Sequence, residues 1–113
     1  MKSYTDFEQS KKLAKILSSE SADMCYGIDD DTLTFEELPW LTPYHTYTYK
    51  EHYIPCWSFA ALLEVIRNAG RYELQMYEGG YYFEANGFMT ESYFNPIDAC
   101  YEMILKLNEQ KLL

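Results

Sequence analysis

The sequence is poor in basic residues. It has 9 lysines and arginines against 18 acidic residues, and its formal net charge is −9. Neither Lys nor Arg occurs between residues 16 and 49, where acidic residues accumulate. The negative electrostatic potential of such a protein repels the phosphate backbone of nucleic acids, so we expect no direct binding to nucleic acid. The acidic surface either keeps the protein soluble or presents a face to a basic partner.

Long apolar runs and paired cysteines are also missing. No run is long enough to span a membrane, and the charged N-terminus lacks the apolar core of a signal peptide. Three isolated cysteines, Cys25, Cys56 and Cys100, fit reduced thiols better than a disulfide framework. We therefore expect a cytoplasmic protein without membrane contact. A length of 113 residues, 48% of them hydrophobic, predicts one domain over residues 1–113.

Motifs for metal binding and catalysis are absent as well. An EF-hand loop starting at Asp29 would lack its glycine and its closing glutamate. His45, His52 and Cys56 do not have the spacing of compact zinc sites, even with a remote cysteine added. The chain contains no phosphate-binding loop and no nucleophile elbow. The sequence thus predicts no metal, no cofactor and no enzymatic signature.

The clearest helical pattern covers residues 58–69, which we predict to form the central core helix. Ser58 suits the N-cap position, and Gly70 suits a left-handed C′ position after the last turn. The apolar residues at i, i+3, i+4 and i+7 that form one stripe are Phe59, Leu62, Leu63 and Ile66.

Two further helices are predicted near the ends of the chain. Residues 5–18 begin with Thr5 and Glu8 at the spacing of a capping box. Residues 96–110 follow Asn95, a good N-cap, and start with a proline, which is favoured in the first turn.

Alternating residues at 72–93 predict a three-stranded antiparallel meander between the second and third helices. Its hairpin loops are expected at Gly79-Gly80 and Asn86-Gly87. Residues 45–53 alternate Tyr and Thr and can add a fourth strand, and residues 22–26 can be extended and partly buried. We therefore predict an α+β domain with three helices packed on one face of a three- to four-stranded antiparallel sheet.

Two surfaces are candidates for binding a protein partner. One is the acidic segment 23–37, and the other is the tyrosine-rich strip 44–53, in a chain with 12 tyrosines. Tyrosine serves sheet cores and interfaces equally well, so the strip can also pack on the sheet. The residues expected to contact a partner are Asp29, Asp30, Asp31, Glu36, Glu37, Tyr47, Tyr49 and Tyr53.

Cys56 suggests an alternative of a different class. It lies at the predicted start of the central helix with His52 and Trp57 nearby, and a helix N-terminus can activate a thiol. A pocket there would suit a small enzyme or a ligand-binding protein. A cysteine among apolar residues is more often a small buried hydrophobe, so we favour a structural role.

Four stretches carry a resemblance to a known family. They are ESADMCY (20–26), IPCWSFAALL (54–63), the strands at 72–83 and NPIDACYEMI (95–104). Together they resemble a family of small uncharacterised proteins carried by phages and mobile elements of gut bacteria. The resemblance implies a cytoplasmic accessory protein and supplies no activity, cofactor or site residues.

For such an accessory protein, the expected partner is a basic, nucleic-acid-binding host protein. The acidic surface would imitate nucleic-acid phosphates in a basic groove of that partner. A homodimer formed through a sheet edge or through the leucines at the C-terminus is compatible with this hypothesis.

Overall fold

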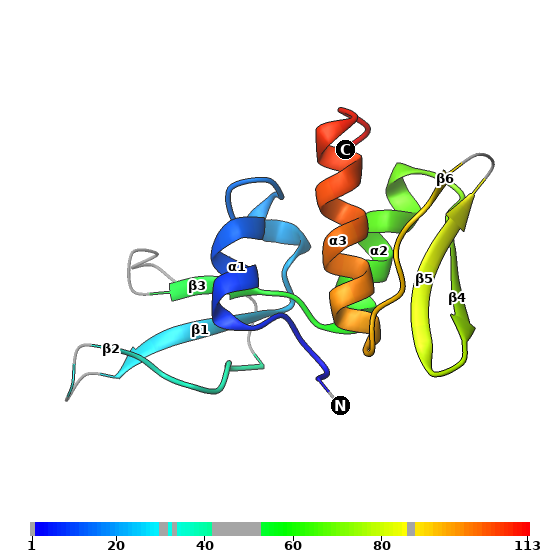
Figure 1. Ribbon diagram of the computed structural model, residues 1–113. Helices are drawn as coiled ribbons and strands as arrows, with labels where there is room; N and C mark the ends of the chain where they lie inside the picture. The colour runs from blue at the N-terminus through cyan, green and yellow to red at the C-terminus, as the bar shows by residue number, and fades with distance from the viewer. Residues whose placement is uncertain (1, 30–31, 33, 42–52, 86–87) are drawn as a thin grey trace.

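A computed structural model describes residues 2–29, 32, 34–41, 53–85 and 88–113, with only the backbone at Asp29 and Phe88. It confirms the α+β class (Figure 1). In chain order the elements are α1 (Phe7–Leu13), the 3-10 turn η1 (Ser19–Ser21), β1 (Met24–Asp29), β2 (Thr34–Phe35), β3 (Tyr53–Cys56), α2 (Phe59–Ala69), β4 (Glu73–Tyr77), β5 (Gly80–Ala85), β6 (Phe88–Met89) and α3 (Pro96–Glu109).

The described strands form two antiparallel sheets, with strand orders β2-β1-β3 and β4-β5-β6. The second sheet is the predicted meander, and the first contains the segment around residues 22–26 that was expected to be extended. Of the fourth strand predicted over 45–53, only Tyr53 is described, and it pairs with Gly27 in the first sheet. The first sheet therefore depends on pairing between segments distant in sequence.

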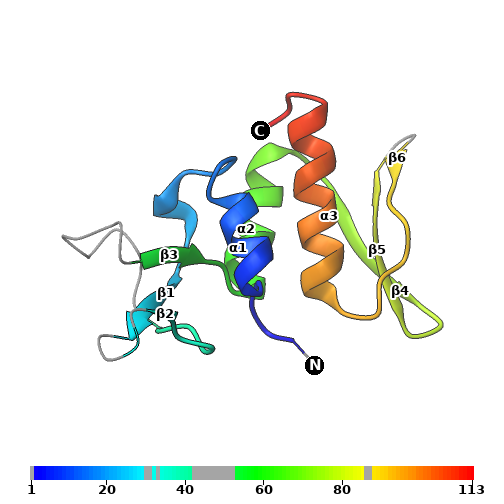
Figure 2. The same ribbon diagram turned by 60° about the vertical axis from the view of Figure 1, so that its left-hand side comes forward.

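The helices lie between the two sheets, as Figures 1 and 2 show from two directions. Helix α1 contacts β3 of the first sheet, whereas α3 contacts β5 of the second sheet and packs against α2. The prediction that all three helices cover one face of a single sheet is therefore not confirmed. Two sheets replace the one because β3 finds its hydrogen-bonding partner in β1 and not in the meander.

The buried apolar side chains form two clusters, one near each of the two sheets. The main core lies where α2, α3 and β5 meet, and includes Leu62, Ile66, Phe83 and Ile104. Phe59 and Leu63 of the predicted α2 stripe pack against it, which confirms the stripe. The smaller cluster lies around the first sheet, and its buried members are Met24, Tyr26 and Cys56.

The ends of α2 and α3 follow from capping. The hydroxyl of Ser58 accepts the N–H of Ala61, and the side chain of Asn95 accepts the N–H of Asp98, so both N-caps are confirmed. Gly70 has φ 159° and ψ −169°, an extended conformation instead of the predicted left-handed one. The chain therefore leaves α2 towards β4 without a left-handed cap.

Helix α1 is shorter than the predicted 5–18, and its N-cap is Asp6 instead of Thr5. Asp6 and Gln9 form a reciprocal capping box, one residue further along than the predicted pair. Thr5 is not available as a cap, because its backbone and hydroxyl bind the backbone of Trp57 at 2.9 and 3.1 Å. Tertiary contacts thus displace the start of α1.

The first hairpin of the meander differs from the prediction by one residue. Tyr77 pairs with Gly80, so the two-residue loop is Glu78-Gly79 and not Gly79-Gly80. Both loop residues have positive φ, 52° and 80°, as a type I′ turn requires. Gly80 belongs to β5, where a Cβ would collide with the hydroxyl of Ser92 unless that hydroxyl rotates. The loop predicted at Asn86-Gly87 lies outside the described residues.

Candidate functional site

The structure describes the side chains of three residues predicted to bind a partner: Glu36, Glu37 and Tyr53. Glu36 and Tyr53 are half-buried and Glu37 is exposed. The other predicted side chains lie outside the described part of the chain; they are Asp29, Asp30, Asp31, Tyr47 and Tyr49. The candidate site can therefore be built from the stretch after β2 and from the start of β3.

Trp40, which the sequence did not single out, connects these residues. Its indole Nε1–H donates to the carboxylate of Glu36 at 2.9 Å. Its ring meets the ring of Tyr53 edge to face, with centroids 5.6 Å apart. The indole also lies close to Gly27, where a Cβ would be 3.0 Å from the ring. Two predicted residues thus converge on one unpredicted tryptophan.

Backbone hydrogen bonds hold the same stretch against β1. Trp40 exchanges two of them with Cys25, at 2.6 and 3.1 Å, and the N–H of Glu36 donates to the carbonyl of Gly27 at 2.8 Å. We call residues 36–41 the acidic ridge. It follows the edge strand β2 and is anchored at both ends, so its exposed side chains project from an ordered backbone.

The exposed side chains of the acidic ridge are both charged and apolar. Leu38 is 68% exposed and Leu41 is 83% exposed, and Glu37, which precedes Leu38 in the chain, is exposed as well. An exposed leucine alone needs no explanation, whereas large apolar side chains gathered on an ordered surface are typical of protein-binding sites. The stretch after β2 therefore combines exposed apolar and charged side chains on a backbone that is hydrogen-bonded to β1.

Cys56 and Trp57 belong to the core and do not form the alternative pocket. Both are 0% exposed. The thiol of Cys56 lies 3.4 Å from the carbonyl oxygen of Thr5 and 3.6 Å from its hydroxyl. Trp57 donates its indole N–H to Ser21 at 2.9 Å. His52, the third member of the predicted pocket, lies outside the described residues.

The environment of Cys56 opposes nucleophilic chemistry. Burial raises the pKa of its thiol, and hydrogen bonding to Thr5, Ser10 and Tyr26 offsets only part of that effect. A thiolate is the reactive form of cysteine, so a buried, protonated thiol is inert. The interpretation of Cys56 as a structural residue agrees with this geometry.

Among the described residues, no cluster of His, Cys, Asp or Glu side chains is placed to hold a metal ion. His45 and His52 lie outside this part of the chain. None of the helices that the structure describes combines the length and the apolar character needed to cross a membrane.

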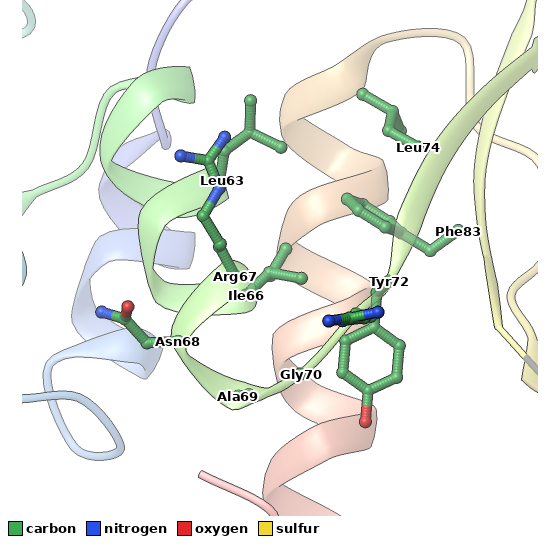
Figure 3. A pocket seen from close by; sticks show the side chains of 10 residues that line it. Leu63, Ile66, Arg67, Asn68, Ala69, Gly70, Tyr72, Leu74 and Phe83 are labelled. Atoms are coloured by element: carbon green, nitrogen blue, oxygen red, sulfur yellow. The ribbon is translucent and has the colours of Figure 1, made fainter.

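A pocket that sequence reasoning missed opens between the last turns of α2 and the meander (Figure 3). Its volume is about 410 Å³. Ile66 and Leu63 of α2 face Leu74 and Phe83 of the strands across it. Local patterns could not reveal this pocket, because its walls come from separate elements. The one signal in the sequence was the closeness of Arg67 and Arg71, both of which line it.

Comparisons of the chain with protein-family models, with curated proteins and with solved structures found no match. The resemblance to proteins of phages and mobile elements therefore stays a prediction.

Proposed function

We propose that the protein is a non-enzymatic binding protein that recognises another protein through the acidic ridge. One observation carries the proposal: Leu38, Leu41 and Glu37 are exposed on a backbone that Trp40 anchors to β1. A preformed surface binds without first losing much conformational entropy, so its contacts contribute more fully to affinity.

The charge of the chain defines the chemistry of the partner. With a net charge of −9 for the chain and no Lys or Arg between residues 16 and 49, this segment attracts a basic surface. Electrostatic attraction mainly accelerates the encounter and excludes acidic competitors, while apolar contacts hold the complex together. The partner therefore combines basic residues with an apolar groove that accepts the two leucines.

A basic nucleic-acid-binding protein of the host fits this description. The carboxylates of the acidic ridge would occupy positions that such a protein offers to phosphates, as expected for an accessory protein from a phage or mobile element. The leucines would add contacts that a nucleic acid does not make. This distinguishes the proposed mode of binding from simple competition by negative charge.

The test is an affinity capture with tagged protein from a host lysate, with and without nuclease treatment, followed by mass spectrometry. The test variant is Leu38→Ser/Leu41→Ser. The matched control is Met76→Ser/Met89→Ser, which removes two apolar side chains that are 68% and 66% exposed on the meander.

We expect one basic protein to be captured in both lysates by the wild type and by the control, and to be lost with the test variant. Purified partner should then bind with an affinity that decreases with salt, because the attraction is electrostatic. Equal capture by both variants would exclude the acidic ridge as the binding surface. Capture that disappears on nuclease treatment would show bridging by nucleic acid and contradict the proposal.

A further inference from the structure

The two arginines of the chain, Arg67 and Arg71, both line the pocket between α2 and the meander. All other cationic side chains of the chain are lysines. The guanidinium group differs from an ammonium group in that it can bind a carboxylate through two parallel hydrogen bonds. The fold has therefore placed its only bidentate anion-binding groups at one cavity of a strongly acidic protein.

Neither arginine is committed to a strong partner within the described part of the chain. Arg67 lies 3.8 Å from Glu64, and both side chains are largely exposed, at 78% and 63%. An exposed pair of this kind contributes little to stability. Arg71 is exposed and forms no ion pair with the described residues. Both guanidinium groups are thus available to a ligand at the mouth of the pocket.

Apolar side chains form the inner wall of the pocket, and polar groups form much of the rest of its lining. Ile66 and Phe83 are almost completely buried and form part of the main core, and Leu63 and Leu74 pack against them. Figure 3 shows these four side chains directed into the space between α2 and the strands, whereas Asn68 points away from it. Ligand sites commonly combine an apolar lining with a few polar groups that orient the ligand.

We propose that this pocket binds a small organic carboxylate with an apolar body. The body would lie against the half-buried side chains of Leu63 and Leu74, next to the buried Ile66 and Phe83, and the carboxylate would bind Arg67 and Arg71. A volume of about 410 Å³ is near the lower end of the range for ligand sites, about 300–1,000 Å³, and therefore selects a small molecule.

A singly charged ligand suits the site better than a phosphate. The pocket lies at the C-terminus of α2, where the free carbonyl groups of the last turn carry partial negative charge. The cationic side chain of Arg67 offsets this charge. The net charge of −9 adds to the repulsion of anions. The cost of removing a ligand from water rises with the square of its charge, whereas its attraction to two arginines rises only in proportion to the charge, so a pocket with an apolar wall favours a monoanion.

The test is a titration of the full-length, isotopically labelled protein by NMR with phenylacetate, its neutral analogue phenylacetamide, and phenyl phosphate. The test variant is Arg67→Gln/Arg71→Gln. The matched control is Lys12→Gln/Lys111→Gln, which changes the net charge equally. Lys12 lines a different, lysine-rich pocket beside α1, so this control also reports binding there.

We expect phenylacetate to shift the signals of Ile66, Tyr72 and Phe83. The affinity should fall about tenfold or more in the arginine variant and for phenylacetamide, because a charge-assisted interaction is lost. The lysine control should bind like the wild type. The proposal would be overturned if phenylacetamide bound as tightly as phenylacetate, or if the arginine variant bound phenylacetate as tightly as the wild type. It would also be overturned if phenyl phosphate bound more tightly than phenylacetate, or if no signals from this pocket shifted.

Discussion

The indole ring of Trp40 lies against the backbone of Gly27, so closely that a Cβ at residue 27 would come within 3.0 Å of it. Gly27 is the residue of β1 that pairs with Tyr53, and the ring of Tyr53 also contacts Trp40. Because Gly27 has no side chain, the indole of Trp40 can pack against β1, and Trp40 in turn anchors the acidic ridge. A glycine inside a strand often marks such a close approach.

Gly27→Val is therefore expected to displace Trp40. Overpacking at a well-packed site typically costs about 1–3 kcal/mol of unfolding free energy, and Gly27→Ala should cost less. The indole N–H signal of Trp40 should move in the NMR spectrum, while that of the buried Trp57 stays in place. Glu73→Val, an exposed position in β4, is the control. An unchanged Trp40 signal in Gly27→Val would contradict the close packing of the indole against residue 27.

Asp23 supports the N-terminus of α2 through Ser58. Its carboxylate accepts the N–H of Ser58 at 2.9 Å and also the hydroxyl of Ser58. The same hydroxyl oxygen accepts the N–H of Ala61 at 3.2 Å. We expect Ser58→Ala to lower the unfolding free energy by about 1 kcal/mol, as for other N-caps.

Asp23→Ala should also destabilise the protein, and the double variant should lose less than the sum of the single losses, because the two residues act as one cap. Urea denaturation measures all three variants. Glu20→Ala removes an exposed acidic residue nearby and is the control. Strict additivity of the two single effects would show that Asp23 does not act through Ser58.

The three cysteines should resist modification in the folded protein. Cys25, Cys56 and Cys100 are each 0% exposed. Burial raises the pKa of Cys56, and it raises the pKa of Cys100 to about 12. Native protein at neutral pH should react with a thiol reagent only on the timescale of unfolding, and all three thiols should react rapidly in denaturant. Rapid labelling of native Cys56 would restore the hypothesis of a reactive site there.

Asp98 connects the N-terminus of the chain to α3. Its carboxylate accepts hydrogen bonds from Lys2, Gln9 and Asn95, each at 2.8 Å. Burial by itself would raise the pKa of Asp98, but the hydrogen bonds and the charge of Lys2 outweigh it, so the pKa lies below its ordinary value of 3.8. The folded protein therefore binds this proton more weakly than the unfolded chain does.

This contribution to stability is complete above the unfolded pKa and is lost as the pH falls through the lower folded pKa. We expect Asp98→Asn to be less stable than wild type at neutral pH and to show a flatter loss of stability below about pH 4. Denaturation at a series of pH values measures this difference. Glu102→Gln on the same helix should retain the wild-type slope. If Asp98→Asn lost stability as steeply as the wild type at acid pH, the acid dependence would come from other carboxylates.

Local signals predicted most of the secondary structure correctly. The stripe of α2, the caps at Ser58 and Asn95, and the alternation in the meander all depend on residues close together in the chain. The errors at the start of α1 and in the first hairpin were each of one residue. Hydrogen bonds to the distant Trp57 occupy Thr5 and so move the start of α1, and the pairing of Tyr77 with Gly80 moves the hairpin loop.

The candidate sites were less predictable. Glu36, Glu37 and Tyr53 were selected for charge and aromatic character, but no local pattern indicated that Trp40 would join two of them. Cys56 was considered for its position before a helix, and only its surroundings show the thiol to be buried and protonated. The arginine-lined pocket has no sequence motif, because three elements build its walls.

The sequence by itself determined the helices, the meander and the acidic character of the protein, because propensity, capping, alternation and net charge are properties of neighbouring residues or of composition. Only the tertiary structure decided that β1 pairs with β3, that the strands divide into two sheets, and that both arginines line one pocket. These outcomes depend on pairing and packing between segments far apart in the chain, which no local pattern encodes.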